Sequence, residues 1–202
     1  MTTSKSVLAA ICAALVISTA QATTVIPPSF DELVGQAQLI FQGTVTDTQS
    51  QWTGEGGSRR IVTLVSFKVD EAIKGEPGHT YTVRMLGGTV GDQTMEVSDS
   101  PKFKVGDRDI LFVENNGTQF IPLVGIMHGR FRIQNEKATG REVVMSNDGH
   151  PVKDVVELGK HEEHAHGKSA SQPSAAAATE RALGSADFKS AIKAKLGKGD
   201  NK

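Results

Sequence analysis

Three histidines in the last third of the chain have the side-chain type and spacing that could bind a metal ion. His161, His164 and His166 lie within six residues, with Glu162 and Glu163 between them. Neutral imidazoles bind zinc, copper or nickel, and close spacing in a flexible chain lets them converge on one ion. A weak zinc or copper site is one interpretation, and a solvated polar linker is the other. The order H-E-E-H places the second histidine three residues after the first instead of four, so it does not predict a zinc protease.

Four further residues are candidates for binding contacts. Trp52, the single tryptophan, stands beside a glycine-rich stretch and could stack on a sugar or a protein, or fold back as a cap on the core. Arg59 and Arg60 nearby could recognise a carboxylate, or could be solvated charges at a strand edge. His128 lies between two apolar runs, where it is either a site residue or a turn histidine held by the backbone.

The sequence contains no catalytic constellation that we recognise. It has no G-x-S-x-G motif, and no order of serine, histidine and aspartate stands out. The acidic residues between positions 92 and 107 lack the D-x-D-x-D-G spacing of a calcium loop. We therefore expect a protein that is not an enzyme, with no catalytic residues and no cofactor apart from zinc or copper at the histidine cluster.

The N-terminus has the pattern of a secretory signal peptide. Lys5 precedes an apolar run over residues 7–17, and Ala20-Gln21-Ala22 forms an A-x-A cleavage site. The run is shorter than the roughly twenty residues of a membrane-spanning helix. The chain is therefore expected to be exported to the periplasm or the cell exterior, with no membrane span after signal cleavage.

The composition of the chain limits which partners and which stabilising bonds are expected. The chain of 202 residues has 22 basic and 23 acidic residues and a net charge of −1, which argues against nucleic acid as a partner. Its one cysteine, Cys12, lies within the predicted signal peptide. The exported chain would then contain no disulfide and would depend on its hydrophobic core for stability.

Short apolar runs that alternate at period two predict an all-β domain. Ser29 and Glu32 have the S-x-x-E spacing of a capping box, which predicts a short helix over residues 30–37. The second apolar run is long and is expected to bend strongly, as strands do in small barrels. Together these patterns fit a β-sandwich or a small, partly open β-barrel, and the long bent strand favours the barrel. A short N-terminal helix and a low-complexity C-terminal tail complete the expected fold. The expected strands cover residues 39–48, 59–73, 79–86, 109–114, 119–125, 130–134 and 142–146.

Changes of composition divide the chain into four parts. Residues 1–22 form the signal peptide and residues 23–157 the β-barrel domain. Residues 158–185 are rich in His, Ala and Ser and are expected to form a flexible linker, because such a segment cannot build a core. Residues 186–202 form a basic tail in which a short helix is expected, since its apolar residues are spaced four apart.

Three motifs resemble a recurring line of small exported bacterial proteins. They are A-x-x-I-x-x-G-x-V at Ala37–Val45, T-x-x-x-F-x-V-x-x-x-x-K-G at Thr63–Gly75, and P-x-F-x-x-G-x-x-x-x-L-F at Pro101–Phe112. Their order is also similar to that in tissue inhibitors of metalloproteinases and netrin-like modules, which carry A-D-x-V and F-K-G at similar places. The resemblance implies an OB-like barrel. Those inhibitors begin with a cysteine that chelates the zinc of the target, and this chain has no cysteine after position 22.

The sequence therefore predicts an exported, non-enzymatic binding or interaction module. Its working surface is expected at a rim formed by the loop of Trp52 and the segment 87–101. One alternative is a metalloprotease inhibitor or protease partner, which would place residues 23–29 beside the same rim. Another is a periplasmic metal-binding protein that acts through His161, His164 and His166. The expected partner is accordingly an exported protein or a protease.

Overall fold

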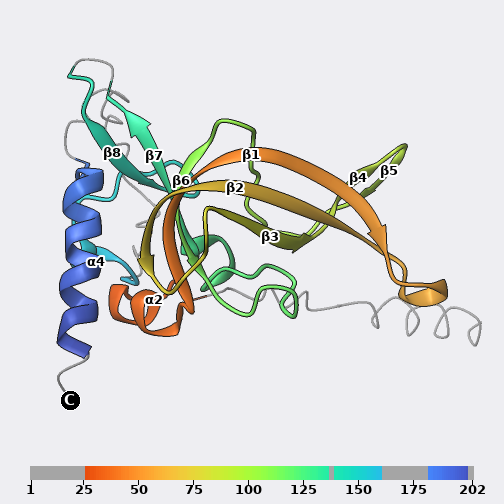
Figure 1. Cartoon of the computed structure of the whole chain (residues 1–202), viewed down its shortest axis with the longest axis horizontal. Coiled ribbons are helices and arrows are strands. Elements are labelled where there is room, and N and C mark those ends of the chain that lie inside the picture. The colour runs from red at the N-terminus through yellow and green to blue at the C-terminus, as the bar shows by residue number, and fades with distance from the viewer. Residues whose placement is uncertain (1–25, 137–138, 161–181, 200–202) are drawn as a thin grey trace, which may run out of the picture.

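The fold is built on one six-stranded antiparallel sheet, shown in Figure 1. The structure is a computed structural model, and it describes residues 26–136, 139–160 and 182–199. The strand order is β3-β2-β1-β6-β7-β8, and β4 and β5 form a separate two-stranded hairpin. The strands are β1 (Leu39–Thr53), β2 (Arg60–Lys74), β3 (Thr80–Leu86), β4 (Gly88–Val90), β5 (Gln93–Met95), β6 (Arg108–Val113), β7 (Arg130–Asn135) and β8 (Glu142–Ser146). The helices are α2 (Phe30–Gln36) and α4 (Ser185–Gly199), with 3₁₀ turns η1 (Gly56–Ser58), η2 (Ile126–Gly129) and η3 (Val155–Glu157).

The prediction of an all-β fold with a short N-terminal helix is confirmed. The sheet does not close into a barrel, because β3 and β8 stand at its two ends and do not pair with each other. The predicted strand over residues 119–125 is replaced by turns with a single bridge between Leu123 and Val113. Pro122 in that segment has no N–H to donate, and Gly125 has a positive φ of 62°, so a regular strand cannot continue there.

Helix α2 begins at the predicted capping box. The Glu32 N–H donates to Ser29 Oγ at 3.3 Å, and the Ser29 N–H donates to Glu32 Oε2 at 2.8 Å. These two bonds satisfy backbone N–H groups at the start of the helix, for which no preceding turn supplies an acceptor. Leu33 and Val34 then point into the core and fix the helix against the sheet.

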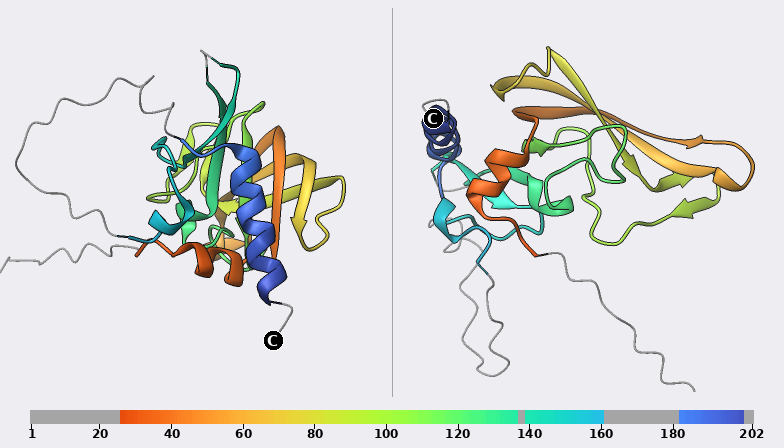
Figure 2. Two further views of the ribbon diagram at one scale, coloured as in Figure 1. Left: turned by 90° about the vertical axis from the view of Figure 1, so that its left-hand side faces the viewer. Right: turned by 90° about the horizontal axis from the view of Figure 1, so that it is seen from below.

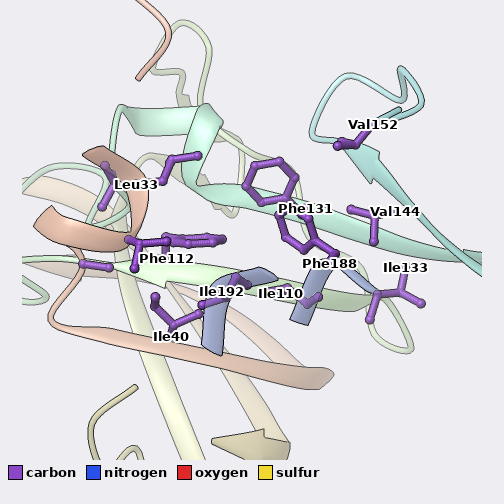
Figure 3. Close-up of a cluster of buried hydrophobic side chains, with 13 residues drawn as sticks. Leu33, Ile40, Ile110, Phe112, Phe131, Ile133, Val144, Val152, Phe188 and Ile192 are labelled. Carbon is purple, nitrogen blue, oxygen red and sulfur yellow. The ribbon is translucent and has the colours of Figure 1, made fainter. Parts of the chain in front are cut away.

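The sheet is covered on both faces, so its central strand β6 is apolar at consecutive positions. Ile110 and Phe112 belong to a core under the two helices, and Leu111 and Val113 belong to a second core on the opposite face. Side chains alternate between faces along a strand, which explains why a continuous apolar run is buried here. Figure 3 shows the first core, in which rings from the sheet surround a ring from α4.

Helix α4 forms part of this first core, although it follows the predicted linker. Phe188 and Ile192 are fully buried, and the Phe188 ring lies 4.8 Å from the Phe131 ring between centroids. Two lysines of the helix pair with one acid of the sheet: Lys189 Nζ lies 2.7 Å and Lys193 Nζ 2.6 Å from the Glu71 carboxylate. The predicted helix is present, but the tail that contains it packs on the sheet. Figure 2 shows the helix running along one end of the molecule.

Strands β1 and β2 form a long bent hairpin that extends beyond the rest of the sheet (Figure 1). Three register shifts interrupt their pairing near the base, between Ile40 and Phe41, Gln42 and Gly43, and Val45 and Asp47. Irregularities of this kind bend a strand and increase its twist. We call the part of this hairpin from Thr46 to Val65, which lies beyond the pairing with β6, the arm.

Within the described residues no helix is both long enough and apolar enough to cross a bilayer.

Candidate functional site

The inner face of the arm is defined by the pairing of β1 with β2. Thr48 pairs with Val65, Ser50 with Thr63 and Trp52 with Ile61. Because paired residues in an antiparallel sheet share a face, these six side chains form one surface. Near the base this surface is continuous with the buried Val45 and Phe67 pair, so it continues the second core outward.

A groove of about 280 Å³ opens between this inner face and the segment 85–103. The hairpin of β4 and β5 lies over the inner face of the arm, and Figure 2 shows it as a second layer beside β1 and β2. The lining combines hydroxyl groups with apolar side chains. The polar residues are Thr48, Ser50, Thr63, Thr89, Ser100 and Lys102, and the apolar ones include Val65, Met85, Val97 and Phe103.

The hydroxyls of the groove floor form a short chain that binds the start of β4. Ser50 Oγ and Thr63 Oγ1 lie 2.9 Å apart, and Thr63 Oγ1 donates to the Gly87 carbonyl at 2.7 Å. The Gly87 N–H in turn donates to the Ile61 carbonyl at 2.9 Å. These hydrogen bonds therefore fix the place at which the polypeptide leaves β3 and crosses the arm.

Gly88 makes this crossing possible because it has no side chain. Its φ is +129°, and a Cβ atom there would lie 2.3 Å from Thr63 Oγ1 and 2.4 Å from Ser50 Oγ. We expect Gly88→Ala to lower the free energy of unfolding by about 2–4 kcal/mol, from backbone strain and overpacking together. Chemical denaturation followed by circular dichroism measures this change.

A matched glycine separates the two effects. Gly91 at the tip of the same hairpin has a φ of +59°, and nothing lies within 4 Å of an added Cβ. Gly91→Ala should therefore show backbone strain alone, about 1–2 kcal/mol. Equal losses for the two variants would mean that close packing against the arm does not hold β4.

The opposite wall of the groove, at Lys102 and Phe103, is held by a buried ion pair. Arg130 Nε donates to Asp109 Oδ1 at 2.9 Å, and Arg130 Nη1 donates to the Lys102 carbonyl at 2.7 Å. The Arg130 guanidinium also lies 4.1 Å from the centre of the Phe103 ring. Its Nη2 reaches Asp107 Oδ2 at 2.8 Å. One buried cation therefore positions both groove residues of this wall.

Burial dominates the electrostatics of this pair. Asp109 is fully buried, and its burial raises the pKa of its carboxyl from 3.8 to about 6, although the charge and hydrogen bonds of Arg130 oppose the rise. The neighbouring Asp107 adds to the rise by repulsion. The ion pair thus favours the charged carboxylate of Asp109, whereas burial alone would favour its protonated form.

Trp52 and Arg59 are brought together, but at the outer end of the arm. The Arg59 guanidinium lies 4.3 Å from the centre of the Trp52 ring, which is a cation–π contact. Trp52 belongs to β1 and not to a loop, is only partly exposed, and shares the inner face with the groove. Arg60 pairs with Thr53 in the ladder and is exposed.

His128 is placed away from the other predicted rim residues. It lies in η2 and does not line the groove. Burial lowers the pKa of its imidazole, while Asp148 and Asp99 oppose that shift. The imidazole is therefore biased toward its neutral form.

The predicted metal site at His161, His164 and His166 lies outside the described residues, so it stays a prediction. Within the described part of the chain, no cluster of three or more His, Cys, Asp or Glu side chains has the arrangement of a metal site.

Residues of the segment 87–101, which the sequence predicts at the working surface, line the groove, but the hydroxyl residues of the arm were not identified from the sequence. Thr48 and Ser50 belong to an alternating run of hydroxyl residues near the end of β1, and Thr63 interrupts the apolar side of β2. Hydroxyl groups at period two on an otherwise apolar face are a signal that could have indicated a polar-lined groove. The double glycine at 87–88 is the second such signal.

Comparison with known proteins returned no match: no family model, no curated protein and no solved structure is similar to this chain.

Proposed function

We propose that the protein is an exported, non-enzymatic binding module that takes its ligand in the groove of the arm. The observation that supports this proposal is the groove itself, which combines hydroxyl groups and apolar side chains on the face that carries Trp52. A partly apolar concavity with a few hydroxyl groups is the usual composition of a binding site. The expected ligand is a segment of another exported protein, because such a segment offers both backbone polar groups and side chains.

The chemistry of the lining favours binding over catalysis. Lys102 is the one titratable side chain among the described residues that line the groove. General acid–base catalysis needs a titratable group within hydrogen-bonding distance of the reacting atom, and most catalytic schemes need a second group to assist it. A groove of hydroxyls and aliphatic groups satisfies hydrogen bonds of a bound chain and buries its apolar parts.

The metalloprotease-inhibitor alternative makes a geometric demand on the N-terminal segment. The described part of that segment packs elsewhere: Pro28 lies against Gly125, and Ser29 lies against Gly159. Neither of these glycines lines the groove. No contact of the described residues therefore favours that alternative, and we propose a binding role without protease inhibition.

Site-specific photocrosslinking in the exporting cell tests the proposed function. A photoreactive residue at position 48 faces the groove, whereas one at position 49 sits on the other face of the same strand. We expect position 48 to give a covalent adduct with one defined partner, and position 49 to give little. Equal formation of adducts with another protein from both positions would contradict the proposal, as would a position 48 that crosslinks only to a second copy of this chain.

A pair of arginine variants tests the same groove without a probe. Thr48→Arg places a long cation at the groove, and Gln49→Arg makes the same change in charge at an exposed site on the other face. Thr48→Arg is expected to lower affinity for the crosslinked partner by about tenfold or more, since a charge in a groove without a counter-ion is costly to desolvate. Gln49→Arg should leave the affinity within about twofold.

A further inference from the structure

The outer half of β1 has backbone groups without a partner in the described structure. Pairing with β6 ends at Thr44, and the last bonds on that side join Val45 to the segment 106–107. Beyond Val45, β1 pairs with β2 alone. Residues 46–53 therefore present an open sheet edge.

The hydrogen-bonding pattern of β2 identifies which residues point outward at this edge. The Ile61 carbonyl accepts from Gly87, and the Val69 N–H donates to His79, so odd-numbered residues of β2 bond toward β3. Even-numbered residues then bond β1, because antiparallel strands alternate in this way. Their partners are the odd-numbered residues of β1, so the N–H and C=O groups that point outward belong to Thr48, Ser50 and Trp52.

The two ends of the six-stranded sheet, in contrast, are covered. On β3, the Arg84 N–H donates to the Asn116 side chain at 3.0 Å, and the Leu86 N–H donates to the Phe120 carbonyl at 2.7 Å. On β8, the Val144 N–H donates to the Leu183 carbonyl at 2.9 Å. Proteins generally cover, charge or shorten exposed strand edges to prevent pairing with another chain. In the arm, seven of the eight edge residues are uncharged, Asp47 being the exception.

We propose that a second copy of this chain pairs with the arm along this edge, with β1 antiparallel to β1 and a twofold axis at Ser50. In this register each Ser50 exchanges two hydrogen bonds with the Ser50 of the other copy. Thr48 of one copy faces Trp52 of the other, so every outward-pointing backbone group finds a partner. The interface is isologous, as it is in most homodimers.

Charges next to the edge complement each other in the same register. Asp47 of one copy lies opposite Thr53 of the other, and Arg60 is the partner of Thr53 on the next strand. Asp47 and Arg60 share a face, and a separation of two strands is roughly 10 Å, within reach of the two side chains. Both are exposed, and neither side chain forms a hydrogen bond or ion pair within the described residues. Pairing of the copies would give each a partner.

The second copy also contributes to the groove. Trp52 shares the inner face with Thr48, so across the interface its indole lies beside Thr48 of the other copy, which lines the groove there. Each groove is therefore completed at its β1 side by the tryptophan of the partner. The inference goes beyond the proposed function, and dimerisation is measured without a ligand, so either can fail alone.

Proline at position 50 tests the pairing directly. Ser50→Pro removes an outward-pointing N–H and no bond to β2, whereas Ser50→Ala removes the hydroxyl and keeps the N–H. By analytical ultracentrifugation of the full chain lacking residues 1–22, we expect a dimer for the wild type and for Ser50→Ala. Ser50→Pro should weaken the dimer by about thirtyfold, for the two symmetric bonds lost. The proposal would be overturned if the wild type stayed monomeric at about 100 µM, or if Ser50→Pro dimerised as strongly as the wild type.

A charge exchange tests the register without altering the backbone. Asp47→Arg and Arg60→Asp should each weaken self-association, and a mixture of the two should form a heterodimer in which both contacts are again opposite in charge. Within one chain the two positions are about six residues, or roughly 20 Å, apart along the arm, so intrachain pairing cannot produce this rescue. Failure of the mixture to associate better than either variant alone would reject the Ser50 register.

Discussion

Replacing Phe188 with alanine is expected to lower the free energy of unfolding by about 3–5 kcal/mol, the usual cost of removing a fully buried phenylalanine ring. Phe188 has no exposed surface, and its ring contacts the rings of Phe30, Phe112 and Phe131. Figure 3 shows the Phe188 side chain between α4 and the sheet, which is where its removal would leave a cavity. Urea denaturation followed by far-ultraviolet circular dichroism measures the change.

An exposed phenylalanine provides the matched control. Phe120 keeps 63% of its surface exposed, so Phe120→Ala should change the free energy of unfolding by less than about 0.5 kcal/mol. A small effect at both positions would show that α4 is not an integral part of the core. A large effect at Phe188 alone would establish that the domain extends through residue 199, beyond the composition boundary at residue 158.

Replacing Arg130 with methionine is expected to destabilise the protein by about 3–5 kcal/mol at pH 8, because it leaves the Asp109 carboxylate buried without its partner. Arg130 and Asp109 are both buried, and Arg130 also holds the Lys102 carbonyl and stacks on Phe103. Methionine retains much of the side-chain volume, so the loss reports mainly on charge and hydrogen bonding. The groove wall at Lys102 and Phe103 should loosen as well, which faster amide hydrogen exchange at residues 101–104 would reveal.

The cost of Arg130→Met should depend on pH in a defined direction. The pKa of Asp109 in the folded protein is about 6, above its ordinary value of 3.8, and Arg130 is among the groups that lower it. Without Arg130 the folded-state pKa rises further, so the carboxyl of the variant is protonated in the folded state at pH 5. At pH 5 both folded proteins bind this proton more tightly than their unfolded chains do, and the variant binds it more tightly than the wild type. The destabilisation should therefore be smaller at pH 5 than at pH 8, by up to about 1.4 kcal/mol for each unit by which the folded-state pKa of the variant exceeds that of the wild type.

Arg132 on the same strand controls for the loss of one positive charge. It is partly exposed, and its charge makes the smallest of the contributions that shift the pKa of Asp109. Arg132→Met should therefore cost less than about 1 kcal/mol, with a weaker pH dependence in the same direction. A destabilisation by Arg130→Met that stays constant from pH 5 to pH 8 would mean that Asp109 does not take up a proton when its partner is removed.

Local patterns in the sequence predicted the elements well. The S-x-x-E spacing at Ser29 and Glu32 became the observed capping box, because both halves of that interaction lie within one turn. The alternating runs became β1, β2, β3, β6, β7 and β8, with ends that differ by a few residues. The segment 119–125 shows the limit of this approach, since an apolar run that contains Pro122 and ends at a left-handed Gly125 does not make a ladder.

The candidate site was predicted less well, for reasons that depend on distance in the sequence. Trp52 was placed at a rim in a loop, but it lies on a strand, because β1 runs on to Thr53 and carries it to the end of the arm. The pairing of Ser50 with Thr63 depends on register shifts near the base of β1, which no local pattern specifies. Arg130 and Asp109 lie 21 positions apart, and neither is an unusual residue in its own segment.

The sequence by itself determined which stretches become strands and where α2 begins, because period-two alternation and capping act between residues a few positions apart. Only the tertiary structure decided that the helix predicted in the basic tail packs on the sheet, with Phe188 inside the core. It also decided that the sheet stays open and that one half of β1 has a free edge. These features arise from contacts between distant segments, whose energy depends on the packing and burial of the whole molecule.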